Sequence, residues 1–115
     1  MKTLRTATAV TDRDRQMLLS LKAVILAHDP EAEVILYGST ARGARQPDSD
    51  YDVLVITSRE LSSSEARRLD GAVYSVELEM GIVLSLMLYS REQWFDPRMK
   101  GSPYRTNVIG EGITL

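Results

Sequence analysis

The segment Tyr51–Thr57 (YDVLVIT) is an almost unbroken run of Val, Leu and Ile. Short runs rich in β-branched residues are typical of strands, and this continuity predicts burial on both faces of a sheet. A sheet that is buried on both faces requires helices to cover it. With 115 residues the chain has room for one such core, so we predict a single domain over residues 1–115.

Apolar residues spaced three or four apart predict two helices that could cover this sheet. The first follows Thr11, a suitable N-cap, and ends at Asp29-Pro30, because the residue before a proline is disfavoured in the α region. The second follows Ser62–Ser64 and ends at Gly81, a residue type that favours helix C-termini. Each helix has one apolar face, so each is expected to pack on the sheet.

Two further apolar runs, Glu33–Tyr37 and Ile82–Tyr89, are predicted to be strands. A short last helix is expected to begin at Ser102-Pro103, with serine as the N-cap. The first ten residues are expected to be a loose lead-in, and residues 91–101 to be irregular. Helices interleaved with three strands predict an α/β (α+β) domain in which helices pack on a small sheet.

Charge and composition exclude several classes of function. A net charge of −2 predicts no basic surface extended enough for long nucleic acid. The absence of cysteine excludes disulfides and thiolate metal sites. The apolar run that begins at Ile82 is too short to cross a bilayer, and the first residues lack a cleavable signal. We therefore expect a soluble, cytoplasmic protein without a membrane partner.

Two aspartates stand at the start of the central apolar run. Asp50 and Asp52 are two residues apart, and side chains at i and i+2 of a strand point to the same side. Two carboxylates held together repel each other unless a cation lies between them, and Mg²⁺ prefers such oxygen ligands. The pair therefore indicates a divalent-metal site, although turn formation and solvation also explain a bare Asp-x-Asp.

Gly38 and Ser39 directly follow the first predicted strand. Glycine permits a tight turn and a close backbone approach, and Ser39 offers a hydroxyl and an N–H at an expected helix start, where anions bind. Arg42 and Arg45 follow within two turns and could neutralise phosphates. Gly-Ser alone signals only a turn. The order of strand, Gly-Ser, ten residues, Asp-x-Asp and strand is far more specific.

The segments Gly38–Gly43 (GSTARG) and Ser49–Val53 (SDYDV) resemble the signature of the polymerase-β-type nucleotidyltransferase superfamily. Within it, the chain resembles the minimal nucleotidyltransferases (MNT) of bacteria and archaea, small single domains that are often encoded beside a HEPN-domain partner as toxin–antitoxin pairs. The resemblance implies a mixed sheet, Mg²⁺ (or Mn²⁺) and a nucleoside triphosphate, usually ATP. It also implies transfer of a nucleotidyl group to a hydroxyl.

The resemblance further implies roles for individual residues. Asp50 and Asp52 become catalytic residues and metal ligands, while Gly38 and Ser39 hold the triphosphate. Arg42 becomes a second-rank phosphate contact. A HEPN-type protein becomes a candidate partner.

One position departs from the family pattern. Active members carry a third carboxylate on a following strand, where it can bind metal and assist deprotonation of the attacking hydroxyl. The polar position of the corresponding strand is Ser85, and Glu77 and Glu79 lie before it on a helix face expected to point outward. Two functions remain open: a nucleotidyltransferase acting on a protein or small-molecule hydroxyl, and a degenerate binding module or antitoxin that holds a HEPN-type partner.

Overall fold

The computed structural model describes residues 1–8, 10–43 and 50–115. Within these residues the chain forms a five-stranded sheet with the strand order β1-β5-β2-β3-β4. The strands are β1 (Lys2–Thr3), β2 (Glu33–Tyr37), β3 (Tyr51–Thr57), β4 (Leu84–Ser90) and β5 (Ile113–Thr114). β3 pairs parallel with β4 and antiparallel with β2, so the sheet is mixed, as the resemblance implied.

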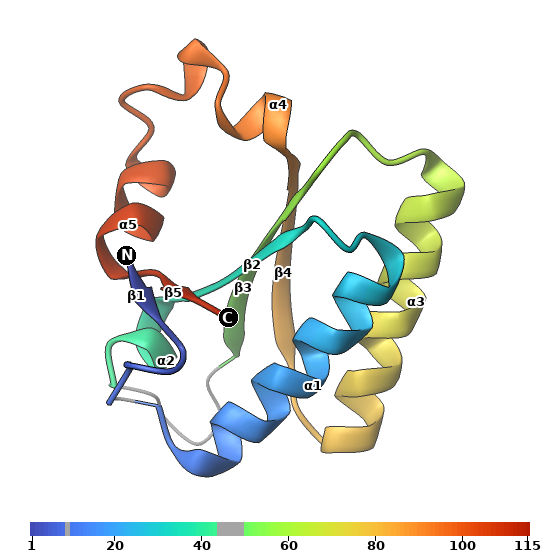
Figure 1. The fold of residues 1–115 in the computed structure, drawn as a ribbon, viewed down its shortest axis with the longest axis vertical. Helices are drawn as coiled ribbons and strands as arrows, with labels where there is room; N and C mark the ends of the chain where they lie inside the picture. The colour runs from blue at the N-terminus through green and yellow to red at the C-terminus, as the bar shows by residue number, and fades with distance from the viewer. Residues whose placement is uncertain (9, 44–49) are drawn as a thin grey trace.

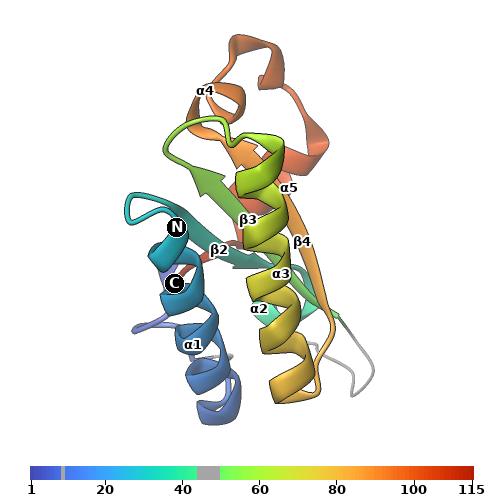
Figure 2. The same cartoon turned by 90° about the vertical axis from the view of Figure 1, so that its right-hand side faces the viewer.

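Two long helices cover one face of the sheet, α1 (Asp12–His28) and α3 (Ser63–Met80), and they lie side by side in both views (Figure 1, Figure 2). Thr11 caps α1 by accepting a hydrogen bond from the Asp14 N–H at 3.1 Å. Gly81 ends α3 in the left-handed conformation, with φ of 65°. The two predicted helices are confirmed. In the described part of the chain, no helix is both long and apolar enough to cross a membrane.

The opposite face is covered by α5 (Pro103–Glu111), which lies behind the sheet in Figure 2. Ser102 caps this helix and Pro103 is its first residue, as predicted. The prediction that residues 91–101 are irregular is wrong, because this segment contains α4 (Arg91–Trp94) and the 3₁₀ helix η1 (Pro97–Met99). Ser90 starts α4 through a capping box with Gln93, a signal that the sequence carried.

β3 divides the core in two because its side chains alternate between the faces of the sheet. Tyr51, Val53 and Val55 pack with apolar residues of α1 and α3, on the side that we call the α1/α3 face. Leu54 and Ile56 pack with Trp94 and Val108 on the opposite side, which we call the α5 face. The predicted burial of this strand on both faces is confirmed.

The N-terminal segment is part of the fold, so the prediction of a loose lead-in is wrong. β1 pairs parallel with β5, which places both ends of the chain close together (Figure 1). Leu4, Ala7 and Val10 are buried in the core of the α1/α3 face. The Arg15 guanidinium of α1 donates to the carbonyl oxygens of Leu4 and Ala7 and so holds the segment in place.

Candidate active site

Gly38 and Asp52 bring the two halves of the sequence motif together. β2 ends at Tyr37, which pairs with Asp52 on the neighbouring strand. Gly38 then turns the chain into α2 (Gly38–Ala41) with φ of 76°, a conformation that L-residues rarely adopt. A Cβ atom at Gly38 would overlap the Asp52 carboxylate. Glycine is therefore required here both by the backbone conformation and by the space that the carboxylate fills.

The two aspartates lie where β3 begins. Asp50 is exposed and directly precedes the strand, whereas Asp52 is half-buried within it. Burial raises the pKa of Asp52, the nearby Asp50 charge raises it further, and the Arg42 guanidinium opposes both effects. The carboxylates are thus close enough to repel each other, which fits a pair that holds a cation.

Tyr51, between the two aspartates, fixes the direction in which they point. Its side chain faces α1, is 4% exposed, and its hydroxyl donates to Asp14 Oδ1 at 2.7 Å. Since side chains alternate along a strand, anchoring Tyr51 on the α1/α3 face turns Asp52 to the α5 face. α1 therefore helps to position the acidic pair through its hydrogen bond with Tyr51.

Glu111, the last residue of α5, is a site residue that the sequence analysis missed. Its Oε1 accepts from the Gly38 N–H at 3.1 Å, and its Oε2 accepts from Arg42 Nη1 at 2.8 Å. Its negative charge also raises the pKa of Asp52. One signal was available: Tyr104, Val108 and Glu111 recur at helical spacing, so Glu111 shares the side of α5 that faces the sheet.

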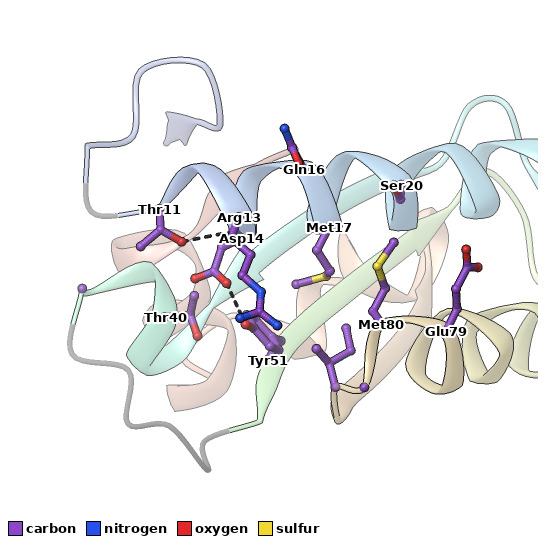
Figure 3. Close-up of a pocket in the computed structure, with 13 residues that line it drawn as sticks. Thr11, Arg13, Asp14, Gln16, Met17, Ser20, Thr40, Tyr51, Glu79 and Met80 are labelled. Carbon is purple, nitrogen blue, oxygen red and sulfur yellow. Dashed lines mark hydrogen bonds between the residues drawn. The ribbon is translucent and has the colours of Figure 1, made fainter.

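Ser85 lies beside Asp52. The two residues are paired in register on the parallel strands β3 and β4, so their side chains share the α5 face. Ser85 is exposed, as a position open to a site should be. The two glutamates that precede it belong to α3 on the other face, where Glu77 Oε2 accepts from the Leu84 N–H at 3.4 Å. Glu79 lines a cavity on that face (Figure 3).

This cavity has a volume of about 810 Å³ and lies between the start of α1 and the end of α3. Figure 3 shows Met17 and Met80 on its two walls and the hydrogen-bonded pair of Asp14 and Tyr51 at one end. Thr40 also lines it, with a buried hydroxyl that has no hydrogen-bond partner among the described residues. Asp50 and Asp52 are not among the residues that line this cavity. The candidate active site is therefore placed at the acidic pair and the Gly38 turn, and not in this cavity.

Aromatic side chains fill the α5 face next to the acidic end. The Tyr104 hydroxyl donates to the Tyr37 hydroxyl at 3.0 Å, and the two rings meet edge to face at 5.6 Å. Tyr104 also contacts Tyr89 and the buried Trp94. Burial raises the pKa of both Tyr37 and Tyr104, so both phenols stay neutral at physiological pH and act as packing and hydrogen-bonding groups.

The donor set of this site fits Mg²⁺ held jointly with a phosphorylated ligand. No three acidic or histidine side chains of residues 1–8, 10–43 and 50–115 come together in a way that could hold a metal ion. Mg²⁺, however, is commonly bound by one or two carboxylates together with substrate phosphates and water. Asp50 and Asp52 match that requirement. Arg45 and Ser49, two residues of the sequence motif, lie outside the described residues.

Comparison with known families agrees with this geometry. Residues 20–106 match the sequence model of a family described as "Nucleotidyltransferase domain", which covers more than half of the chain. The matched range includes Gly38, Ser39, Asp50, Asp52 and Ser85. No match to a curated protein reaches significance. The chain therefore belongs to the nucleotidyltransferase domain family, and its general role is nucleotidyl transfer.

Proposed function

We propose that the domain binds Mg²⁺ and ATP on the α5 face and transfers a nucleotidyl group to a hydroxyl of a protein or small molecule. The observation that carries the proposal is the contact between Gly38 and the half-buried Asp52, with the Asp50 charge close by. A pair of carboxylates whose repulsion raises the pKa of one member is stabilised by a divalent cation. The turn beside them offers N–H donors suited to phosphate oxygens.

In the proposed reaction, the acceptor hydroxyl oxygen bonds to the α-phosphorus of ATP as the bond to the bridging oxygen breaks and pyrophosphate leaves. Mg²⁺ would offset the charge of the triphosphate and of the leaving group. Asp50 and Asp52 would hold the ion, the Gly38 and Ser39 turn would orient the phosphates, and Arg42 would neutralise one of them. The serine hydroxyl of Ser85 is too weak a base to take the acceptor proton, so the proton passes to water and we expect slow transfer.

A second candidate function is favoured by Ser85 itself. It lies in register with Asp52, where active relatives are expected to carry a carboxylate. A domain of the minimal nucleotidyltransferase type that lacks this group would keep nucleotide binding and lose most of its chemistry. It would then serve as a binding module or antitoxin that holds a HEPN-type partner protein.

The metal assignment is tested by isothermal titration of Mg²⁺–ATP into the protein and into the double variant Asp50→Asn/Asp52→Asn. We expect the variant to stay folded and to lose binding. The matched control is Asp12→Asn/Asp70→Asn, which removes two exposed charges from α1 and α3. Equal Mg²⁺–ATP affinity in the double variant and the wild type would contradict the assignment of Asp50 and Asp52 as metal ligands.

The two candidate functions are separated by incubation with labelled ATP, Mg²⁺ and the product of the neighbouring reading frame. Label transferred to that product, and lost in Asp50→Asn/Asp52→Asn, supports the enzyme. A stable complex without transfer supports the binding module.

A further inference from the structure

Glu111 occupies the place that the proposed function gives to phosphate oxygens. Its two carboxylate oxygens accept from the Gly38 N–H at 3.1 Å and from Arg42 Nη1 at 2.8 Å. Both donors are groups assigned above to the triphosphate. Carboxylate and phosphate groups both present anionic oxygens to such donors, so the two compete for one position. We call the Gly38 N–H and the Arg42 guanidinium the phosphate seat.

The fold holds Glu111 beside this seat and leaves its side chain partly open to solvent. α5 is fixed by Val108, which is fully buried, and Gly112 closes the helix by donating to the Val108 carbonyl at 2.7 Å. The Glu111 side chain is 24% exposed and that of Arg42 is 53% exposed, so solvent reaches the pair. A rotation of the glutamate side chain is enough to vacate both donors, and the helix need not move.

We propose that Glu111 is an internal occupant of the phosphate seat that a nucleoside triphosphate must displace, which makes it a specificity-determining residue. The inference rests on the proposed function. Asp50, Asp52 and Glu111 together place three negative charges near the cation of Arg42. A bare polyphosphate is repelled by this group of charges more strongly than one whose charge is partly offset by Mg²⁺. Glu111 therefore selects the metal-bound triphosphate over free phosphates.

The expected size of the effect follows from competition within one molecule. The apparent dissociation constant equals the intrinsic one divided by the fraction of molecules whose site is open. The Glu111 carboxylate makes both a partly exposed ion pair with Arg42 and a hydrogen bond with the Gly38 N–H. Together these contacts keep the phosphate seat occupied by Glu111 in most molecules. Removing Glu111 should therefore tighten phosphate binding by about three- to tenfold.

The experiment titrates Mg²⁺–ATP, and separately inorganic tripolyphosphate without metal, into wild type, Glu111→Ala and Glu111→Gln. We expect Glu111→Ala to bind Mg²⁺–ATP about three- to tenfold more tightly and to gain still more for bare tripolyphosphate. Glu111→Gln, whose amide oxygen can keep one of the two contacts, should fall between it and the wild type. The matched control is Glu33→Ala, which removes a carboxylate 3.7 Å from Arg91, away from the seat.

Unchanged or weaker Mg²⁺–ATP binding in Glu111→Ala overturns the inference. If the wild type still binds Mg²⁺–ATP and needs Asp50 and Asp52 to do so, the proposed function survives that result. Absence of Mg²⁺–ATP binding in the wild type and in every variant overturns the proposed function and the inference together. An equal gain in Glu33→Ala would assign the effect to net charge and also overturn the inference.

Discussion

The two faces of the sheet are built from different chemistry although the same strand supplies both. On the α1/α3 face, Val53 and Val55 of β3 are fully buried against fully buried aliphatic side chains of α1, Leu18, Leu21 and Ile25. On the α5 face, the strand begins with the carboxylate of Asp52 and then presents Leu54 and Ile56 to a cluster that contains Trp94. A period of two along one strand thus separates the part that stabilises the fold from the part that can do chemistry.

The α5 face also changes along its length. Near α4 it is closed by Trp94, which is 4% exposed, and by the fully buried Val108. Near α2 it holds Asp52, Ser85 and the ion pair of Arg42 with Glu111, all of them partly or fully exposed. Polar groups can stay charged at this end because solvent reaches them. We therefore predict that substitutions on the α1/α3 face change mainly the stability of the fold, whereas substitutions at the acidic end of the α5 face change ligand binding.

The largest effect on stability should come from Leu21→Ala on the α1/α3 face. Leu21 is fully buried, so truncation removes apolar contacts and leaves a cavity. We expect the free energy of unfolding to fall by about 2–5 kcal/mol, measured by urea denaturation. Mg²⁺–ATP affinity of the remaining folded protein should not change. A loss of affinity at temperatures where the variant is folded would contradict the division between the faces.

A smaller loss of stability, with loss of binding, is expected from Gly38→Ala on the α5 face. The new Cβ would stand in the left-handed region and overlap the Asp52 carboxylate. We expect a cost of about 1–3 kcal/mol in unfolding free energy and no detectable Mg²⁺–ATP binding by calorimetry. Gly81→Ala is the matched control, because Gly81 has φ of 65° but open space around its Cβ position. Equal effects of the two variants on binding would show that the overlap with Asp52 does not matter.

Ser85→Asp should change metal binding more than stability. Ser85 is exposed and in register with Asp52, so an added carboxylate would join the pair without being buried. We expect Mg²⁺ or Mn²⁺ to bind about tenfold more tightly, and the metal-free variant to lose less than about 1 kcal/mol from like-charge repulsion. Met87→Asp adds the same charge one pair further along the same face and is the control. A folded Ser85→Asp variant with unchanged metal affinity would refute the third-carboxylate position.

Most of the fold could be predicted because its main elements carry local signals. β2 and β3 have the predicted bounds, Glu33–Tyr37 and Tyr51–Thr57. Both are compact runs that contain β-branched residues, and glycine follows β2 while aspartate and serine flank β3. β4 begins at Leu84 and not at the predicted Ile82, because its register with β3 starts where Tyr51 pairs with Leu84. The apolar run was correctly found, but pairing with another strand decided where the strand starts.

Other features depend on residues far apart in sequence. β1 and β5 contain two residues each and depend on long-range pairing, of β1 with β5 and of β5 with β2. Glu111 joins the site through contacts with Gly38 and Arg42. Helical spacing indicates that Glu111 faces the sheet, but it does not indicate which residues Glu111 contacts there. The Asp-x-Asp and Gly-Ser motifs were found because strand geometry and turn chemistry act locally. The role of each motif residue stays a prediction until ligand binding is measured.

The smallest effect concerns the charge of Asp52. Burial, and then the charge of Asp50, raise its pKa in the folded state, so the folded protein holds this proton more tightly than the unfolded chain. The resulting stabilisation exists at low pH and is lost as the pH rises through the unfolded pKa of about 3.9 and the folded pKa above it. Asp52→Asn should therefore raise the unfolding free energy at pH 7 by less than about 1 kcal/mol, which is measured as a higher melting temperature. This gain in stability should shrink as the pH falls toward 4. Asp70→Asn, on exposed α3 surface, controls for the loss of a charge. Mg²⁺–ATP at pH 7 should make the wild type more stable than Asp52→Asn, because only the wild type binds it. If Asp52→Asn stays the more stable protein in the presence of Mg²⁺–ATP, that result would argue against metal binding at Asp52.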